Sequence, residues 1–399
     1  MQLIKSLRLN EILSFAPEAD AISLAPLNVI IGPNGSGKSN LIEAIELLHS
    51  TPTAFASAIR DGGGVREWLW KGKGGTNNAR IEAIIQDTQQ IRDLRYLLSF
   101  TASGLRTEVT DEVLEEKEKR RPWEDDVFFF YRYSAGRPVI NVCEIVEGEC
   151  PSGSRKIRHL ERQSLVPDES VLSQRKDPDL YPELTWVGQK FGRILTFREW
   201  NFGRYAPLRQ PQPADLPVDN ILPDSRNLGL ILNQLEHTDV GPQLDRLLNR
   251  FLPRYQRFST LIQGGTVQFY LHAQGLKAPV PATRLSDGTI RFLAILALLL
   301  SPTPPPLICI EEPELGLHPD ALSLLAELMV DASMRTQLIV TTHSDSFVSA
   351  LTEEAESVLV CEYRDGTVLT RVEADKLRYW LDKYRLGEIW RIGELGGNP

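Results

Sequence analysis

The chain has 399 residues, of which 42% are hydrophobic, so it is long enough for one elaborated domain or two with a sizeable core. Its formal net charge of −9 argues against a surface that binds nucleic acid throughout, because non-specific binding is mostly phosphate neutralisation. Its longest apolar run is about half of the ~20 residues that a membrane span requires, and its N-terminus has no signal-peptide layout. We therefore expect a cytoplasmic protein with no membrane partner.

A complete phosphate-loop motif follows an early apolar run. Residues 27–31 are predicted to form a buried strand, and residues 41–48 have the apolar spacing of a helix. Between them lies the pattern Gly-x-x-x-x-Gly-Lys-Ser, formed by Gly32, Pro33, Asn34, Gly35, Ser36, Gly37, Lys38 and Ser39. In such a loop, backbone N–H groups surround a polyphosphate, Lys38 reaches the β- and γ-phosphates, and Ser39 offers its hydroxyl to Mg²⁺. The motif predicts the binding of ATP with Mg²⁺.

The middle of the chain is less regular. Residues 79–86, 95–109 and 127–142 alternate between apolar and polar side chains, which predicts strands of an antiparallel sheet. The mixed-charge run 112–126 is expected to be exposed. Prolines then interrupt the segment up to about residue 223, and residues 228–235 and 243–251 have the pattern of short amphipathic helices.

Two apolar runs near the C-terminus end in chemically active side chains. Residues 307–310 read as a buried strand that leads into Glu311, Glu312 and Glu314. Carboxylates at that edge of an α/β sheet are suited to hold Mg²⁺, the role we assign to Glu311, and to activate water, the role we assign to Glu312. Glu314 is expected to be exposed. Residues 338–340 read as a neighbouring strand that leads to His343, which can reach the γ-phosphate side.

A second anion site is predicted before the apolar helix 290–300. Ser286 stands at an N-cap-like position, and Gly288 follows it, so free N–H groups and a hydroxyl meet at the helix start. If the two anion sites lie at opposite edges of the face that binds the nucleotide, one chain cannot bring both of them to the same nucleotide. The simplest solution is a homodimer that forms head-to-tail on ATP binding.

Together these motifs resemble the SMC/RecF group of ABC-type ATPases, and within it the stand-alone ATPases related to the heads of OLD-family nucleases. The order Gly-Pro-Asn-Gly-Ser-Gly-Lys-Ser, Leu-Ser-Asp-Gly, Glu-Glu-Pro-Glu-Leu-Gly-Leu-His-Pro and Thr-Thr-His-Ser carries the resemblance over nearly the whole chain. It implies an α/β P-loop NTPase fold with a mostly parallel core sheet, an antiparallel β subdomain and a mixed insertion. It also implies that Ser286 and Gly288 contact the partner's ATP and that His343 is the switch histidine.

The resemblance suggests two further residues. Arg60 is similar to the arginine loop of SMC heads, and Gln174, with Gln86 as its rival, is the candidate for the glutamine that senses Mg²⁺ and water. The chain departs from the family pattern at Glu311, where Asp is commoner, and at Asp287, where the signature has its first Gly. Neither change removes a required charge or donor, although the longer side chain of Glu311 alters the distance to the metal.

We therefore predict a single ATPase head with an N-terminal lobe (1–165), an insertion (166–275) and a C-terminal lobe (276–399). It would bind and hydrolyse ATP in DNA repair or anti-phage defence, with DNA and a separately encoded effector or nuclease as candidate partners. The 56 residues after His343 are too few for a nuclease domain of the OLD type. The alternatives are an ATP-gated protein-interaction switch that does not bind nucleic acid and, less well matched by the motif spacing, the nucleotide-binding subunit of a transporter.

Overall fold

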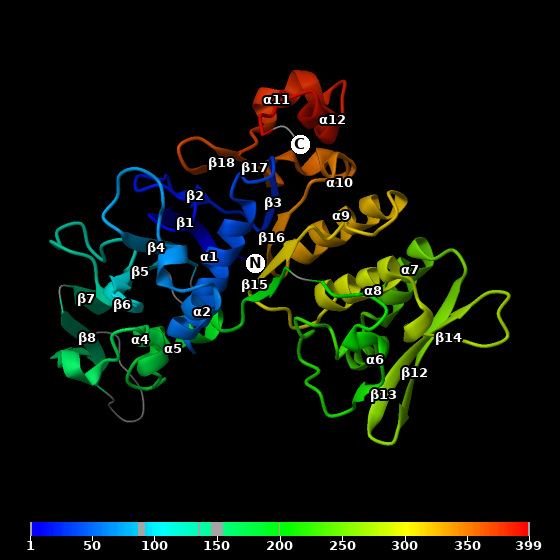
Figure 1. The fold of residues 1–399 in the computed structure, drawn as a ribbon, viewed down its shortest axis with the longest axis horizontal. Helices are drawn as coiled ribbons and strands as arrows, with labels where there is room; N and C mark the ends of the chain where they lie inside the picture. Colours follow the sequence, from blue (N-terminus) through cyan, green and yellow to red (C-terminus); the bar gives the residue numbers. More distant parts are fainter. Residues whose placement is uncertain (1, 87–91, 135, 145–154, 199, 398–399) are drawn as a thin grey trace.

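Three sheets organise the chain in a computed structural model that describes residues 2–86, 92–134, 136–144, 155–198 and 200–397 (Figure 1). The central sheet has the order β10-β15-β16-β3-β17-β18, and its strands are parallel except for β18, which is antiparallel to β17. The strands are β10 (Leu195–Phe197), β15 (Leu307–Glu311), β16 (Gln337–Thr341), β3 (Leu27–Ile31), β17 (Val358–Tyr363) and β18 (Thr367–Arg371).

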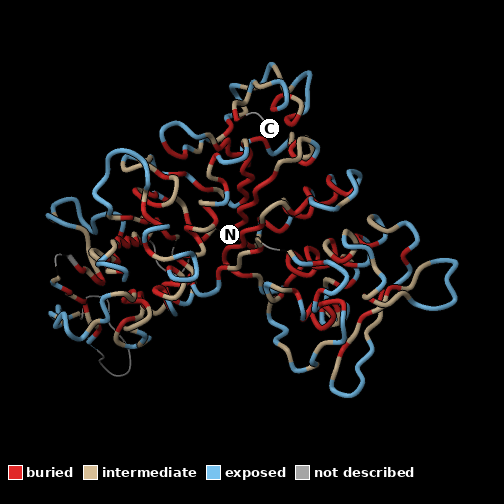
Figure 2. Tube along the Cα trace, viewed as in Figure 1, coloured by how far each residue is buried: buried red, intermediate tan, exposed pale blue. Residues whose placement is uncertain are grey.

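Helices cover both faces of this sheet, which explains why β3 and β16 are buried at every position. Val29 and Ile31 belong to one hydrophobic core with α8 (Asp287–Leu299) and α9 (Asp320–Ser333). Ile30 belongs to a second core with α1 (Lys38–Ser50). The buried segments accordingly gather along the central strands in Figure 2.

The second sheet has eight antiparallel strands in the order β2-β1-β4-β5-β6-β7-β8-β9. They are β2 (Ile22–Ser23), β1 (Ile4–Asn10), β4 (Asn78–Ile85), β5 (Leu94–Ser103), β6 (Arg106–Glu116), β7 (Phe129–Ser134), β8 (Arg137–Cys143) and β9 (Arg155–His159). Apolar residues alternate with polar ones along β4, and the apolar set joins the core that contains α1 and α5 (Pro182–Phe191).

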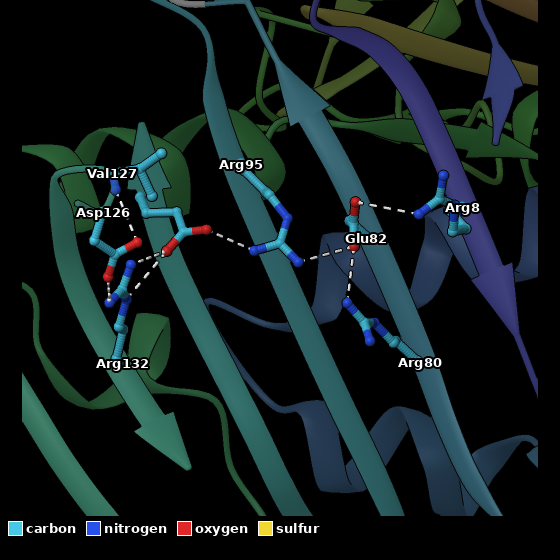
Figure 3. Close-up of polar contacts among 8 residues, drawn as sticks. Arg8, Arg80, Glu82, Arg95, Asp126, Val127 and Arg132 are labelled. Atoms are coloured by element: carbon cyan, nitrogen blue, oxygen red, sulfur yellow. Dashed lines mark hydrogen bonds and ion pairs between the residues drawn. The ribbon is translucent and has the colours of Figure 1, made fainter. Parts of the chain in front are cut away.

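A ladder of ion pairs crosses the polar face of this sheet (Figure 3). Glu82 on β4 pairs with Arg95 on β5, whose guanidinium also contacts Glu115 on β6. Arg132 on β7 contacts Glu115 at 2.7 Å and continues the ladder to Asp126. Opposite charges on adjacent strands contribute about 0.2–1 kcal/mol per pair and favour one strand register.

The third sheet lies beside α8, and Figure 1 shows it on the side opposite the eight-stranded sheet. It contains β11 (Gln212–Pro213), β12 (Tyr255–Gln263), β13 (Thr266–Ala273) and β14 (Val280–Pro281), and α6 (Leu228–Glu236) and α7 (Gly241–Phe251) precede β12. The remaining helices are α2 (Phe55–Asp61), α3 (Val65–Trp68), α4 (Val171–Gln174), α10 (Asp345–Ala350), α11 (Ala374–Leu381) and α12 (Leu386–Arg391), with 3₁₀ turns at Arg162–Ser164, Pro207–Arg209, Ala282–Arg284 and Thr352–Ser357. Within the described residues, every helix is too short or too polar to span a membrane.

The predicted fold class is confirmed, but two local predictions were wrong. The runs 95–109 and 127–142 each contain two paired strands and not one: β5 and β6, which turn at Gly104 where φ is 68°, and β7 and β8. The run 112–126 is not uniformly exposed, because Glu112, Glu115 and Glu116 are buried in β6. Arg95 and Arg132 compensate the charge of Glu115, which no local pattern of charges would indicate.

The segment predicted as an insertion is divided among the layers of the fold. Its first part, including α5, packs in the core that contains α1, whereas β10 is the edge strand of the central sheet. Only the part from β11 onwards forms the third sheet with its two helices. The lobe boundaries 1–165, 166–275 and 276–399 therefore stay sequence predictions.

Candidate functional site

The phosphate loop joins the C-terminal end of β3 to the N-terminus of α1. Gly32 has a φ of 147°, and a Cβ added there would lie 2.1 Å from the carbonyl oxygen of Cys361. Gly37 has a φ of 105°, and its Cβ would lie 2.0 Å from Thr367 Oγ1. Any other residue would clash at these positions and strain the backbone. The packing of the loop therefore requires both glycines, in addition to the role that the motif predicts for them.

Lys38 begins α1 and is buried within the loop. Its Nζ donates hydrogen bonds to Gly32 O (2.7 Å) and Pro33 O (2.9 Å). Burial lowers the pKa of Lys38, and the negative charges of Glu312 and Glu311 nearby oppose this shift. The ammonium is thus held close to both candidate carboxylates.

The rest of the loop presents a surface suited to an anion. Asn34 and Gly35 form its exposed tip, Ser36 is buried, and Ser39 is exposed in the first turn of α1. The N–H groups at this helix start favour negative charge. The exposed loop tip and the start of α1 are therefore compatible with the predicted triphosphate site, which stays a prediction.

A chain of hydrogen bonds fixes the loop from behind. Thr367 Oγ1 on β18 donates to Ser36 O (2.8 Å) and lies 2.6 Å from Ser14 Oγ. Asn40 on α1 donates to the same Ser14 hydroxyl (2.7 Å). Ser14 and Thr367 were not predicted, because they meet the loop only through the pairing of β3 with β17 and of β17 with β18.

Strand register brings the catalytic candidates to the loop. Glu311 on β15 pairs with Thr341 on β16, and Thr341 pairs with Ile30 on β3. These strands are parallel, so the residues after them emerge at one edge of the sheet. β15 and β16 are therefore neighbours, as the sequence predicted.

Glu312 and His343 meet at this edge, with His343 Nε2 3.7 Å from Glu312 Oε1. Glu312 has a φ of 44°, a left-handed conformation that costs energy in a residue with a side chain. Its N–H donates to Thr341 O (3.0 Å), and Arg291 on α8 donates to its carbonyl (3.0 Å). Burial, and then the charge of Lys38, lower the pKa of His343, so its imidazole is neutral at pH 7.

Glu314 is not exposed, contrary to the sequence prediction. It is 9% exposed and accepts hydrogen bonds from Thr342 Oγ1 and the His343 N–H. Burial raises its pKa, and these two bonds oppose the shift. Glu314 therefore ties the loop after β15 to the turn that carries His343. Its burial depends on β16, so the residues around it in the chain did not indicate it.

The signature motif, Leu285 to Gly288, lies at the start of α8. Ser286 is its N-cap, and the Oγ accepts a hydrogen bond from Thr289 N (3.1 Å). Gly288 packs against the loop after β15, because an added Cβ would lie 2.4 Å from Gly316 O. Ser286 and Asp287 are exposed. The predicted second anion site is thus the accessible N-terminus of α8, which contacts the loop after β15 in the same chain.

The structure does not bring Gln174 to the phosphate loop. The side chain of Gln174, at the end of α4, accepts a hydrogen bond from Val166 N (2.7 Å) and donates one to Glu169 O (2.9 Å). Its amide is therefore engaged in its own loop, and the assignment to Mg²⁺ is not supported. The rival Gln86 follows β4, where its N–H donates to Leu3 O. Arg60 is exposed on α2 and contacts Ser57 Oγ, so its role stays a prediction.

Arg198 is a cation near the site that sequence reasoning missed. It follows β10, and its Nε lies 3.5 Å from Glu311 Oε1. The same guanidinium lies 3.5 Å from Glu46 and 4.0 Å from Glu43 on α1. Arg198 therefore compensates part of the negative charge of Glu311. No sequence motif marks it, because its importance follows from the pairing of β10 with β15.

A cavity of about 390 Å³ lies beside the phosphate loop. Its lining includes Ser14 and Asn40 from the hydrogen-bond chain, together with the aromatic rings of Trp70 and Tyr363. The volume lies in the range of small-molecule sites, and polar groups with aromatic rings suit a nucleoside.

Residues 27–349 match the AAA_21 family model, described as "AAA domain, putative AbiEii toxin, Type IV TA system". The chain belongs to this family. An AAA_21 domain of the P-loop type implies a nucleotide ligand and makes ATPase activity the expected function.

Two solved structures and one curated protein are similar to this AAA_21 chain. An SMC head bound to the C-terminal winged-helix domain of ScpA has 14% identity and a TM-score of 0.57, covering 94% of this chain and 99% of that one. An SMC head from Pyrococcus furiosus bound to the C-terminal domain of ScpA has 13% identity and a TM-score of 0.56, covering 96% and 99%. At these identities the likeness shows the fold, which is that of P-loop NTPase heads.

The Old nuclease of Escherichia phage P2 is 39% identical to the chain over 72 residues. This match covers 18% of the chain and 12% of the nuclease. It agrees with the resemblance to OLD proteins that the motifs indicated. The nuclease activity belongs to that protein and does not transfer through so short a match.

The residues present fit ATP and Mg²⁺. Ser36 Oγ, inside the loop, and Glu311 Oε1, at the strand end, are both buried and have no hydrogen-bond partner among the described residues. The hydroxyl can donate a hydrogen bond to a phosphate oxygen. The carboxylate oxygen can bind a hard cation through its water shell. Both atoms lie in motifs from which the nucleotide site was predicted, and the ion pair with Arg198 Nε at 3.5 Å leaves Glu311 Oε1 without a hydrogen bond.

Proposed function

We propose that the chain binds and hydrolyses ATP with Mg²⁺ at the edge of the central sheet. The convergence of Lys38, Glu311, Glu312 and His343 at the ends of three adjacent strands carries this proposal. Lys38 binds the β- and γ-phosphates, while Ser39 and Glu311 hold Mg²⁺, which stabilises charge on the phosphates when bound. The cavity beside Trp70 and Tyr363 holds the nucleoside.

Glu312 orients the attacking water and accepts its proton. Arg291 and Thr341 hold its backbone, which fixes the point from which the side chain extends. His343, neutral at pH 7, lies within reach of the same carboxylate and hydrogen-bonds on the γ-phosphate side. Glu314 positions the His343 backbone.

The same proposal includes a head-to-tail homodimer. Ser286 and Gly288 lie at an exposed helix start, whereas the phosphate loop has its own helix start at α1. Each signature would therefore contact the triphosphate held by the other subunit. Hydrolysis would reopen the pair.

The process we propose is DNA repair or anti-phage defence, with a separately encoded effector or nuclease. The Old nuclease match and the family description support it by analogy. Some described basic residues have acidic partners: Arg155 pairs with Glu183, Arg162 with Glu108, and Arg250 with Glu327. Others in the same stretches, Lys156, Arg158, Arg246 and Arg257, are exposed. With a net charge of −9, binding of DNA would be local, and an ATP-gated protein switch is the alternative.

ATPase rates measured without DNA, with single-stranded DNA and with double-stranded DNA, across a salt series, test this choice. A DNA-linked enzyme should show a DNA-dependent rate that falls as salt rises, because phosphate contacts release counterions. A rate that ignores both DNA forms at every salt concentration would favour the protein switch. No turnover under any condition would contradict ATP hydrolysis itself.

A further inference from the structure

Arg209 is a buried cation with no part in the steps above. It is 2% exposed, at the end of a 3₁₀ turn in the segment between β10 and α6. Its Nε donates to Phe202 O (2.8 Å), and its Nη1 donates to Ala282 O (3.2 Å) and Leu285 O (2.6 Å). Its Nη2 pairs with the carboxylate of Asp287. A buried arginine is stable only when its donors and its charge are matched, and this environment supplies both.

The acceptors of Arg209 lie on both sides of Ser286. Leu285 immediately precedes this serine, Asp287 follows it, and Ala282 begins the 3₁₀ turn that leads into the signature. One guanidinium therefore fixes the chain before and after the N-cap of α8. Arg209, which lies in the segment before α6, thereby holds the turn in the conformation in which Ser286 Oγ accepts a hydrogen bond from Thr289 N.

Asp287 creates an electrostatic problem that Arg209 compensates. The Asp287 side chain is 69% exposed in the same turn as Ser286. A carboxylate there stabilises the start of α8, but it would repel a triphosphate that approaches the turn. The guanidinium of Arg209, paired with this carboxylate, offsets that repulsion.

We propose that Arg209 is a positioning residue that fixes the signature turn and neutralises Asp287, so that the turn accepts the triphosphate held by a second copy of the chain. This inference rests on the head-to-tail dimer of the proposed function. Because Arg209 is buried, it acts through Asp287 and the turn and does not contact phosphate.

The test measures ATP-driven dimerisation by sedimentation velocity in the Glu312→Gln protein, in which hydrolysis is slow. Adding Arg209→Met should weaken ATP-driven dimerisation about tenfold or more, because it leaves the carboxylate unpaired beside the incoming phosphate. The affinity of the phosphate loop for Mg-ATP, measured by calorimetry, should change by less than about twofold, because this loop precedes α1, whereas Arg209 acts at the start of α8. Adding Asp287→Asn to Arg209→Met should restore part of the dimerisation, because it removes the uncompensated charge but does not replace the hydrogen bonds to Ala282 O and Leu285 O.

Arg335→Met is the matched control. Arg335 also donates to backbone carbonyls, Leu299 O (2.7 Å) and Ser301 O (2.8 Å), but at the C-terminal end of α8. Its loss should leave ATP-driven dimerisation unchanged, and Asp287→Asn should rescue nothing in that background. If the Arg209→Met/Asp287→Asn protein stays as weak as Arg209→Met, the role of Arg209 is only structural and the proposal is overturned.

Asp287→Asn alone keeps the proposal testable if Arg209→Met does not fold, because an exposed side chain tolerates this change. It should dimerise with ATP at least as tightly as the Glu312→Gln reference, since it leaves a positive charge beside the turn. Dimerisation about tenfold weaker would mean that the carboxylate itself is required, and the proposal would fail. A reference that binds Mg-ATP and never dimerises would instead contradict the head-to-tail proposal, and this inference with it.

Discussion

His343 Nε2 lies 3.7 Å from Glu312 Oε1, across the ends of two parallel strands that are neighbours in the central sheet. The contact joins a neutral imidazole to a carboxylate whose backbone is held in the left-handed region. Burial and then the charge of Lys38 lower the pKa of His343, and the charge of Glu312 in turn opposes the lowering of the Lys38 pKa by burial. This arrangement can position and activate water beside a γ-phosphate.

Glu312→Gln should bind Mg-ATP but hydrolyse it at least about 100-fold more slowly, since an amide keeps the shape of the carboxylate and cannot accept a proton. Single-turnover assays measure the rate, and size exclusion with ATP should show a trapped dimer. Asp320→Asn is a suitable control, because that carboxylate is 93% exposed on α9. Turnover at the wild-type rate would mean that Glu312 is not the base, and Glu311 or His343 would have to be reconsidered.

Lys38→Ala should weaken Mg-ATP binding about 100-fold or more, because it removes the charged donor that the loop holds inside itself. Isothermal titration decides this directly. Lys376→Ala, an exposed lysine on α11 paired with Glu373, provides the control for loss of one positive charge. Wild-type affinity in Lys38→Ala would exclude the phosphate-loop assignment.

Trp70→Ala should raise the KM for ATP about tenfold with little change in kcat, since base stacking on an aromatic ring contributes about 1–3 kcal/mol. Trp70 lines the cavity next to Asn40, whereas Trp123 is 75% exposed and does not line that cavity. Trp123→Ala should therefore leave KM unchanged. An equal KM in wild type and Trp70→Ala would place the nucleoside elsewhere.

Glu112 gives a prediction for pH. Burial raises its pKa to about 7, against the hydrogen bonds that it accepts from Tyr96, Ser170 and Val171 N. The folded state thus binds this proton more tightly than the unfolded state, and the stability linked to it is lost as pH rises from about 4.5 through about 7.

Relative to Glu112→Gln, the wild-type free energy of unfolding should fall by about 3 kcal/mol or less between pH 5 and pH 8. Urea unfolding of both proteins across this range measures the difference. Parallel pH profiles for the two proteins would contradict the raised pKa.

Much of the site was predictable from sequence because its motifs are local. The phosphate loop, Glu312 and His343 each follow an apolar run that can only be a buried strand in a chain of this kind, and parallel strands bring such ends together. The residues that were missed depend on contacts between distant segments. Glu314 is buried by the β16 turn, and Thr367 reaches the loop through β17.

The mixed charges of β6 show the same limit. The sequence around Glu115 predicts a solvated residue, but in the fold Arg95 and Arg132 on the two neighbouring strands form ion pairs with it. Gln174 shows the converse, because a glutamine near a helix end satisfies local backbone groups as readily as it binds a metal, and here its amide hydrogen-bonds within its own loop. Spacing alone does not separate these two uses.

Mixed dimers test the central claim, that each ATP is hydrolysed between the phosphate loop of one subunit and Ser286 of the other. A pair of Ser286→Arg with Lys38→Ala has both lesions in one composite site and an intact second site. Purified mixed pairs should recover about half of the wild-type rate if the sites act independently, while each variant alone is inactive. The control is a pair of wild type with Lys38→Ala, which must be active. An active control with an inactive Ser286→Arg/Lys38→Ala pair would show that Ser286 acts within its own subunit and would contradict the head-to-tail dimer.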